Sequence, residues 1–292
     1  MRPIASANAT ELVFLPKVSL AAFFFLICLS GFSQDSLLLK MQVDADTLMG
    51  RQEYEGAIKL YSKIISATGL KEKSQFKPLY KRAVAYYSLE ESDSALKDMN
   101  RFIAEFPEVP QARILRALIY RQLGQVDNQL IDLEKAMLIQ SDNIELLRWH
   151  ATLLLEKSQY EKAKADLLRA KIFQDDAELE TNLGMVYYSL GSFDSAIVCL
   201  NSAIELDVMY PASYIYAGSF CLQEGKFELA LEYLNLGLRI EPSNVAATFY
   251  KGVALVELNK TDEGCRCLRK AFEAGEDDAA GYLKEYCYEV TK

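Results

Sequence analysis

The sequence predicts an all-α protein, a solenoid of repeated helix-turn-helix units, on the strength of three observations. Small residues return at a nearly constant interval, in steps of 38, 34, 34, 33, 34 and 34 along the chain. We call the commonest step the repeat period. Apolar residues within a unit recur three, four and seven places apart, which is the spacing of one face of a helix. Only 7 Pro and 14 Gly occur in the whole chain, and this scarcity favours long helices over many turns.

Three aligned series of residues define the repeat. The first series is Ala45, Ala83, Ala117, Ala151, Gly184, Gly218 and Gly252. The second follows twelve places later and is Ala57, Ala95, Gln129, Ala163, Ala196, Ala230 and Gly264. The third follows seven places further on and is Ile64, Phe102, Ala136, Ala170, Ala203, Gly237 and Ala271. Alignment over seven copies predicts seven units of the same structure.

The sixth unit shows how each copy should fold. Ala212–Gln223 and Glu228–Ile240 are both amphipathic, and small residues at their contact points allow two antiparallel backbones to approach closely. Gly225 between them predicts a left-handed residue that ends the first helix, as do Gly124 and Gly191 at equivalent places. A helix of about 13 residues is marginal alone, so neighbouring pairs must stack and share a core.

An aromatic residue before the second small residue completes the pattern, at Tyr54, Tyr160, Phe193 and Phe227. The fifth and sixth copies carry it most clearly, as Leu183-Gly184…Tyr187…Phe193…Ala196 and Ala217-Gly218…Phe227…Ala230. This pattern resembles the tetratricopeptide repeat over residues 38–275. The resemblance implies a right-handed superhelical solenoid of helix-turn-helix repeats.

We expect residues 34–275 to hold about seven repeats, at 38–71, 76–109, 110–143, 144–176, 177–210, 211–244 and 245–275. The first copy is degenerate and is followed by an insert around Gly69–Gln75. Residues 276–292 should form a C-terminal capping helix, because acids at 276–278 suit a helix start and a solenoid end needs a cover.

The N-terminus predicts a signal peptide at residues 1–33. An apolar stretch, Val18–Leu29, is followed by Gly31 and Ser33, the small-x-small pattern that a signal peptidase needs. The stretch is short for a membrane span. We therefore expect a mature chain without an integral membrane span, exported to the periplasm or the outer membrane. An uncleaved N-terminal anchor is the alternative, and lipidation at Cys28 is disfavoured because Ile27 is not small.

Charge and composition exclude several function classes. The net charge is −9 without a basic run, which argues against nucleic acid as a partner. His150 is the sole histidine, and no nucleophile elbow, phosphate loop or metal motif occurs. We expect no enzymatic activity, no cofactor and no metal, and we interpret His150 as a packed core residue.

The resemblance implies that a peptide or helix of a partner protein binds in a concave groove lined by the first helices. Its frame places these residues there: Tyr80, Tyr87, Leu118, Arg121, Arg148, Leu155, Met185, Tyr188, Ile215, Leu222 and Phe249. Thr152 and Thr181 fall on the same face. The set is rich in aromatics, Met and Arg, which dominate interface energetics. The leading hypothesis is therefore a protein-interaction scaffold of the cell envelope, with self-association left open.

Other ligands and an enzymatic function are the alternatives to this hypothesis. Tyr80, Tyr87 and Tyr188 could stack on a glycan or cell-wall ligand. One subgroup of the family binds the C-terminal carboxylate of its partner with Lys, Arg and Asn on successive first helices, and this set of residues is not reproduced here. Arg121 and Arg148 could instead pair with Glu145 and Glu156. An enzyme would require convergent carboxylates in a deep pocket.

The cysteines leave two interpretations open. Export would allow disulfides, and Cys199–Cys221 and Cys265–Cys287 each lie on helices expected to be neighbours. Alternatively, the same residues are small apolar side chains buried at helix contacts.

Overall fold

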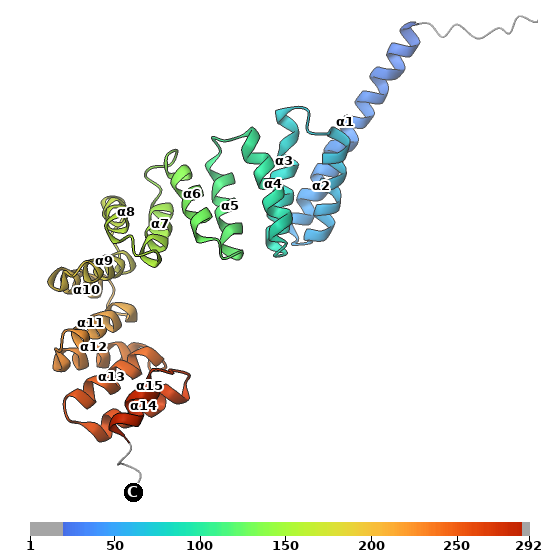
Figure 1. The fold of residues 1–292 in the computed structure, drawn as a ribbon. Coiled ribbons are helices and arrows are strands. Elements are labelled where there is room, and N and C mark those ends of the chain that lie inside the picture. Colours follow the sequence, from blue (N-terminus) through green and yellow to red (C-terminus); the bar gives the residue numbers. More distant parts are fainter. Residues whose placement is uncertain (1–19, 288–292) are drawn as a thin grey trace, which may run out of the picture. The chain divides into compact units, whose positions relative to one another are not determined.

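The computed structural model describes residues 20–287, with side chains from residue 35 onward. Over that range the chain is all-α, as predicted, with no strand. It divides into two compact units, residues 1–106 and 107–292, each of which is described by itself. Figure 1 labels the helices in order.

The first unit contains two helix pairs and a 3-10 turn. The elements are α1 (Leu20–Gly50), α2 (Tyr54–Thr68), η1 (Lys73–Phe76), α3 (Lys77–Ser88) and α4 (Ser92–Glu105). Ala45 and Ala57, the small residues of the first copy, are fully buried between α1 and α2 beside Tyr61. The 3-10 turn falls in the expected insert, and Gly69 ends α2 in the left-handed conformation.

The expected signal peptide lies largely outside the described residues. Residues 1–19 are not described, and α1 begins at Leu20, well before residue 38, where the first repeat is expected to start. No helix in the described part of the chain is long and apolar enough to cross a membrane.

The second unit stacks five helix pairs and a closing helix (Figure 1). The elements are α5 (Pro110–Gln122), α6 (Val126–Met137), α7 (Ile144–Glu156), α8 (Tyr160–Phe173), α9 (Ala177–Ser189), α10 (Phe193–Leu206), α11 (Pro211–Gln223), α12 (Phe227–Ile240), α13 (Val245–Glu257), α14 (Thr261–Glu273) and α15 (Ala279–Tyr286). Each first helix packs on its own second helix, and α7, α9, α11 and α13 also contact one another in succession. This is a helical repeat solenoid; the right-handed sense of its superhelix stays a prediction.

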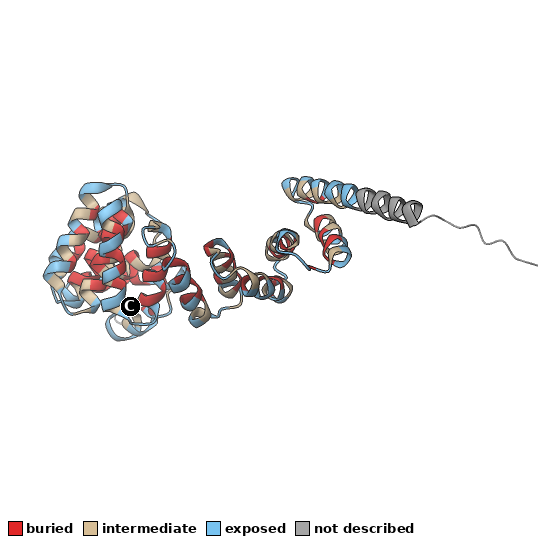
Figure 2. Cartoon of the chain, turned by 90° about the horizontal axis from the view of Figure 1, so that it is seen from above, coloured by how far each residue is buried: buried red, intermediate tan, exposed pale blue. Residues whose placement is uncertain are grey.

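Small residues set the distance between paired helices. A Cβ atom added at Gly218 would lie 2.5 Å from Cγ of Leu234, which is closer than real contacts allow. Gly184 and Gly252 face Leu200 and Leu268 in the same way, each at 2.8 Å. The buried stretches of each helix are therefore the ones that face its neighbours, as the red segments in Figure 2 show.

A left-handed residue ends the first helix of every pair. The predicted glycines are confirmed, with φ of +67° at Gly124, +77° at Gly191 and +70° at Gly225. The other four copies use non-glycine residues at the same place: Gln52, Glu90, Ser158 and Asn259, with φ between 56° and 62°. The turn geometry thus requires a positive φ at this place in every pair, and glycine adopts that conformation with the least steric strain.

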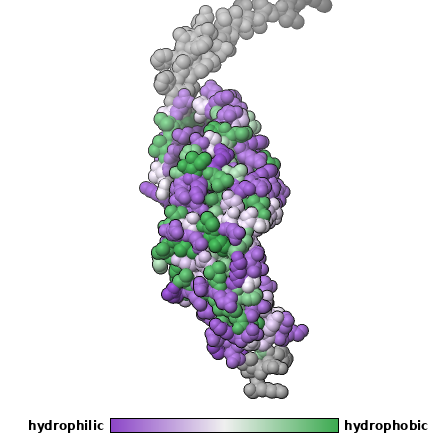
Figure 3. All heavy atoms as spheres, turned by 90° about the vertical axis from the view of Figure 1, so that its left-hand side faces the viewer, coloured by the Kyte–Doolittle hydropathy of each residue, from purple (hydrophilic) through white to green (hydrophobic). Residues whose placement is uncertain are grey.

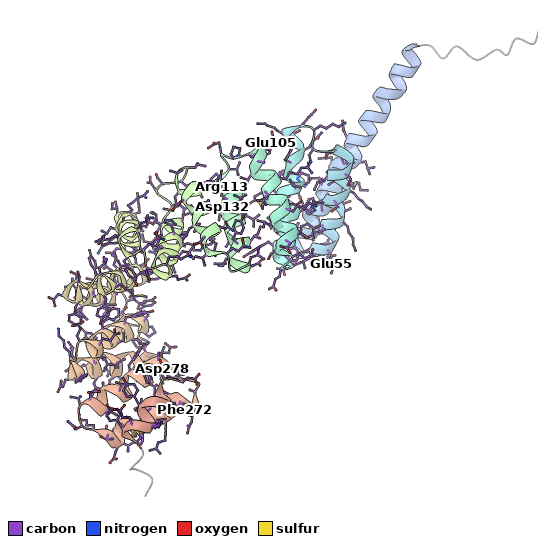
Figure 4. All side chains as sticks on the ribbon, viewed as in Figure 1. Glu55, Glu105, Arg113, Asp132, Phe272 and Asp278 are labelled. Atoms are coloured by element: carbon purple, nitrogen blue, oxygen red, sulfur yellow. A yellow bond between two sulfur atoms is a disulfide. The ribbon has the colours of Figure 1, made fainter. Side chains whose placement is uncertain are left out.

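Buried pairs of polar side chains join the helices of three consecutive helix pairs. Arg116 Nε and Nη2 donate to the two carboxylate oxygens of Asp132 at 2.6 and 2.7 Å, with Asp132 only 1% exposed. Arg113 adds a second cation to the same carboxylate at 3.5 Å (Figure 4). Arg82 and Asp98 repeat this bidentate arrangement between α3 and α4.

In the next pair the arginine is replaced by His150. Its side chain is buried, as predicted, and Nδ1 lies 2.6 Å from Oδ2 of Asp166 on α8. Nε2 of the same ring has no hydrogen-bond partner and lies 3.8 Å from a carboxylate oxygen of Glu134.

At the C-terminus α15 closes the array. A disulfide joins Cys265 on α14 to Cys287 directly after α15, so one of the two bonds considered from sequence is present. Cys199 and Cys221 are free thiols, and so is Cys267. The remaining residues expected in the cap, 288–292, lie outside the described residues.

Candidate peptide-binding groove

The second unit has a cavity of about 560 Å³ on the face formed by its first helices. Helix α7 contributes Thr152, Leu155 and Glu156, and α8 contributes its first residue, Tyr160. The three side chains of α7 follow from helix periodicity, because residues three and four places apart share a face. We call this cavity and its lining the α7–α9–α11 groove.

Helix α9 forms the floor of the α7–α9–α11 groove. It contributes Glu178, Thr181, Asn182, Met185 and Ser189, which follow one another at intervals of three, one, three and four. The opposite face of α9 is buried against the core through Leu179, Leu183 and Val186. The amphipathic pattern of α9 therefore both anchors the helix and aims these five side chains at the groove.

Helix α11 forms the third side, with Ala212, Tyr216 and the preceding loop residue Tyr210. Beneath the groove, Thr181 Oγ1 and Ser213 Oγ are hydrogen-bonded at 3.0 Å, which ties α9 to α11 through two buried hydroxyls. The groove is thus built on packed helices rather than on loops, and its shape is held in place by the core.

Arg148 contacts one of the lining residues of the groove, Glu178, and the neighbouring Asp176. It donates a hydrogen bond to Asp176, and its Nη1 lies 3.5 Å from Oε2 of Glu178. Asp176 also caps α9 by accepting from the Leu179 amide at 3.0 Å. Burial raises the pKa of Asp176, but the hydrogen bonds from Arg148 and Leu179 outweigh it and leave that pKa below its usual value. The pairing with Glu145 or Glu156 considered from sequence is therefore corrected.

The pKa of the Tyr210 hydroxyl is affected by the same two carboxylates. Burial raises the pKa of its hydroxyl, and the charges of Glu178 and Asp176 raise that pKa further. A phenolate would have to form beside two carboxylates, so the hydroxyl stays protonated and can donate a hydrogen bond.

The structure brings four of the residues predicted to face the groove into this cavity, namely Leu155 and Met185 together with Thr152 and Thr181. Ile215 and Phe249 are each only 9% exposed and pack inside the core, where they offer little surface to a ligand. Leu222 is half-buried against Phe249 and its neighbours. The predicted frame is offset on α11, where Tyr216 rather than Ile215 faces the groove.

The other predicted residues lie elsewhere and have partners of their own. Tyr188 stacks on Phe220 with ring centroids 3.9 Å apart, and its hydroxyl donates to Gln223. Arg121 is exposed, with its guanidinium 5.5 Å from the centre of the Trp149 ring. Leu118 is half-buried on α5.

Tyr80 and Tyr87 belong to the first unit. Both are half-buried on α3, and the Tyr80 ring packs on Phe102 at 5.3 Å. They are therefore not assigned to the α7–α9–α11 groove.

Tyr210, Tyr216, Asn182 and Glu178 are groove residues that the sequence did not predict. A signal for two of them is present, because Asn182 and Tyr216 are one repeat period apart and therefore occupy the same place in consecutive repeats. Tyr210 lies in the loop before α11, where helix periodicity gives no information about direction. Across the described residues, no group of three or more His, Cys, Asp or Glu side chains could hold a metal ion.

Comparison with known proteins identifies the class. Family models described as tetratricopeptide repeat match residues 80–143, 178–207 and 211–244. The matched segments of the chain are tetratricopeptide repeats, and arrays of such repeats serve in general as protein-interaction scaffolds.

A curated relative and two solved structures extend the comparison. Human tetratricopeptide repeat protein 13 is 29% identical over 168 residues, which cover 55% of this chain but only 18% of the human protein. The C-terminal part of a TPR repeat-containing protein from Cytophaga hutchinsonii is similar with a TM-score of 0.63, at 16% identity, over 83% of this chain and 99% of that one. A tetratricopeptide repeat protein from Parabacteroides merdae is similar with a TM-score of 0.63, at 12% identity, over 85% of this chain and 96% of that one. The two structures establish a common fold.

Proposed function

We propose that this chain is a non-enzymatic scaffold that binds a peptide or helix of a partner protein in the α7–α9–α11 groove. The observation that carries the proposal is the cavity of about 560 Å³ lined by three consecutive first helices. Its mixture of apolar, aromatic and amide side chains offers both burial for a partner side chain and hydrogen bonds for its backbone.

The glycan alternative has less support from the predicted tyrosines. One face of the Tyr188 ring is already covered by Phe220, and the Tyr80 ring is packed on Phe102. A sugar-binding platform needs an open ring face. Met185 and Leu155, in contrast, offer the adaptable apolar contacts that suit a peptide.

We propose in addition that the protein works outside the cytoplasm, released from a signal peptide or held by an uncleaved anchor. The apolar stretch Val18–Leu29 before Gly31 and Ser33 supports export. The Cys265–Cys287 disulfide supports it independently, because such bonds persist in oxidising compartments. Fractionation of cells expressing the full chain, with mass spectrometry of its N-terminus, would test this: an uncleaved chain in the cytosol overturns it.

The groove is tested by filling it. Ala212 lines the groove, so an Ala212→Trp variant should place a large ring in the cavity. Asn235→Trp is the matched control, because Asn235 is exposed on the second helix α12, away from the groove. Proteins crosslinked to the full chain in envelope fractions should be captured by wild type and by the control but lost from Ala212→Trp. Equal capture by all three, with circular dichroism unchanged, overturns the groove assignment.

A further inference from the structure

The charged side chains that line the α7–α9–α11 groove are all negative. Among its lining residues the only charged side chains are Glu156 and Glu178, and both are exposed. Neither Lys nor Arg is among these lining residues. An acidic side chain of an occupant would therefore find no cation among these lining residues.

The arginine at the end of the groove is already engaged. Arg148 faces both Asp176 and Glu178, and its guanidinium is mostly buried by these contacts. Two carboxylates therefore face this one arginine, which leaves a surplus of one negative charge at this end of the groove, and Glu156 adds a further negative charge to the lining. The raised pKa of Tyr210 fits the same local field.

Aromatic rings lie beside these carboxylates. Tyr160, Tyr210 and Tyr216 line the cavity, and their faces are attractive to an ammonium or guanidinium group that sits near a carboxylate. Asn182 on α9 is half-buried at the groove and offers an amide to a peptide backbone.

We infer that the α7–α9–α11 groove takes a basic segment of its partner, with a Lys or Arg side chain bound between the groove carboxylates and the tyrosine rings. The inference rests on the proposed function and adds the chemical class of the partner. The attraction comes from charges at the protein surface, so it should weaken as salt rises.

The test uses phage-displayed random dodecapeptides, selected on the full-length protein. A Glu156→Gln, Glu178→Gln variant removes two charges and keeps the shape of both side chains. Its matched control is Glu228→Gln, Glu232→Gln, which makes the same charge change at two exposed residues of α12. Ala212→Trp serves as the neutral variant that fills the groove.

We expect wild type and the control to enrich peptides with Lys or Arg. A synthetic copy of the most enriched peptide should bind the Glu156→Gln, Glu178→Gln variant roughly tenfold more weakly, and its affinity for wild type should fall with salt. Enriched peptides without Lys or Arg that still depend on an open groove would overturn the basic-partner inference and leave the proposed function standing. If wild type enriches nothing that Ala212→Trp does not, the proposed function itself fails.

Discussion

Buried polar pairs occupy the same place in three consecutive repeats, as two Arg–Asp ion pairs and one His–Asp hydrogen bond. Arg82, Arg116 and His150 are spaced by one repeat period, as are their partners Asp98, Asp132 and Asp166. A buried carboxylate is tolerated only when a cation and its hydrogen bonds offset desolvation. Each Arg–Asp pair therefore stabilises the fold conditionally, because removing the carboxylate leaves a mostly buried arginine without its bidentate partner.

Replacing Asp132 by Ala should destabilise the second unit by about 3–5 kcal/mol, because Arg116 would keep a mostly buried charge without its bidentate partner. Urea unfolding followed by circular dichroism measures this difference. An Arg113→Met, Arg116→Met, Asp132→Leu triple variant removes the carboxylate and both of its cations and should lose much less stability. A single variant as stable as wild type would show that water already solvates Arg116.

The glycines at helix contacts act at the same scale. Gly218→Ala should destabilise the protein by about 1–3 kcal/mol, because the new methyl group would lie 2.5 Å from Cγ of Leu234 and force that side chain to move. Gly281→Ala on α15 is the control, since a Cβ there meets nothing within 4 Å. Thermal unfolding of the two variants compares them directly. A Gly218→Ala variant at least as stable as Gly281→Ala would contradict the close contact.

The free thiols should be unreactive in the folded protein. Burial, with the nearby charge of Glu180, raises the pKa of Cys199 to about 12, and burial raises that of Cys221 to about 11. At pH 8 the thiolate fraction of Cys199 is then roughly a thousandfold below that of an unfolded thiol. Iodoacetamide labelling read by mass spectrometry should be slow in buffer and fast in denaturant. Both thiols also make stability fall as pH rises above their unfolded pKa near 9, because the unfolded chain releases these protons first.

At the scale of the element, the repeat period predicts the helices well and their ends less well. The small residues that recur at this period predict seven helix pairs, because close packing of paired helices demands them. The left-handed turn is predicted only where glycine occurs, and Glu90, Ser158 and Asn259 give no such signal. The start of α1 at Leu20 is also not predicted, since repeat spacing carries no information about a helix that extends past its unit.

The candidate groove is predictable in part for a related reason. Leu155, Met185, Thr152 and Thr181 follow from the periodicity of α7 and α9. Tyr216 has a signal only through its repeat equivalence to Asn182, and Tyr210 has none because it lies in the loop before α11. The buried polar pairs escape prediction although their regular spacing is visible, because charged residues are expected to lie on solvated faces.

The closing helix α15 is an element held by a covalent bond. Its eight residues bury only Ala279 within the helix, so packing alone gives it little stability. Replacing Cys287 by Ser should loosen α15 by about 3 kcal/mol, because the disulfide closes a loop with a sequence separation of 22. Hydrogen exchange should show faster exchange of α15 amides and unchanged exchange in α12. Cys267→Ser is the control, since Cys267 is a free thiol; faster exchange in that variant alone would contradict the role of the disulfide.

At the scale of the whole molecule, stability is distributed over contacts between neighbours. Each helix pair of the second unit contacts its neighbouring pairs, and exposed apolar side chains remain on the second helices, as the green patches of Figure 3 show at the level of α8 and α10. Such an array gains stability pair by pair. The groove therefore depends on α7, α9 and α11 and on their second helices rather than on the full length of the chain.

The equal spacing of the buried polar pairs implies that the chain can be shortened by one unit without breaking its pattern. Removing residues 117–150, one repeat period, joins Arg116 to Ala151 and places Asp166 as far after the arginine as Asp132 is now. The spliced first helix would again have 13 residues, like α5 and α7. We expect this shortened protein to fold cooperatively with one helix pair fewer, as measured by calorimetry and helix content.

Removal of residues 117–148 is the matched control. It deletes two residues fewer than one repeat period, so the remaining repeats are no longer in register. The two halves of the spliced helix would then be turned by about 200° relative to each other around the helix axis, and only one of them could face α8. We expect this second deletion not to fold, and equal stability of the two would contradict the role of the period. Addition or loss of whole units is then a route by which such a protein can change its length while each remaining contact keeps its chemistry.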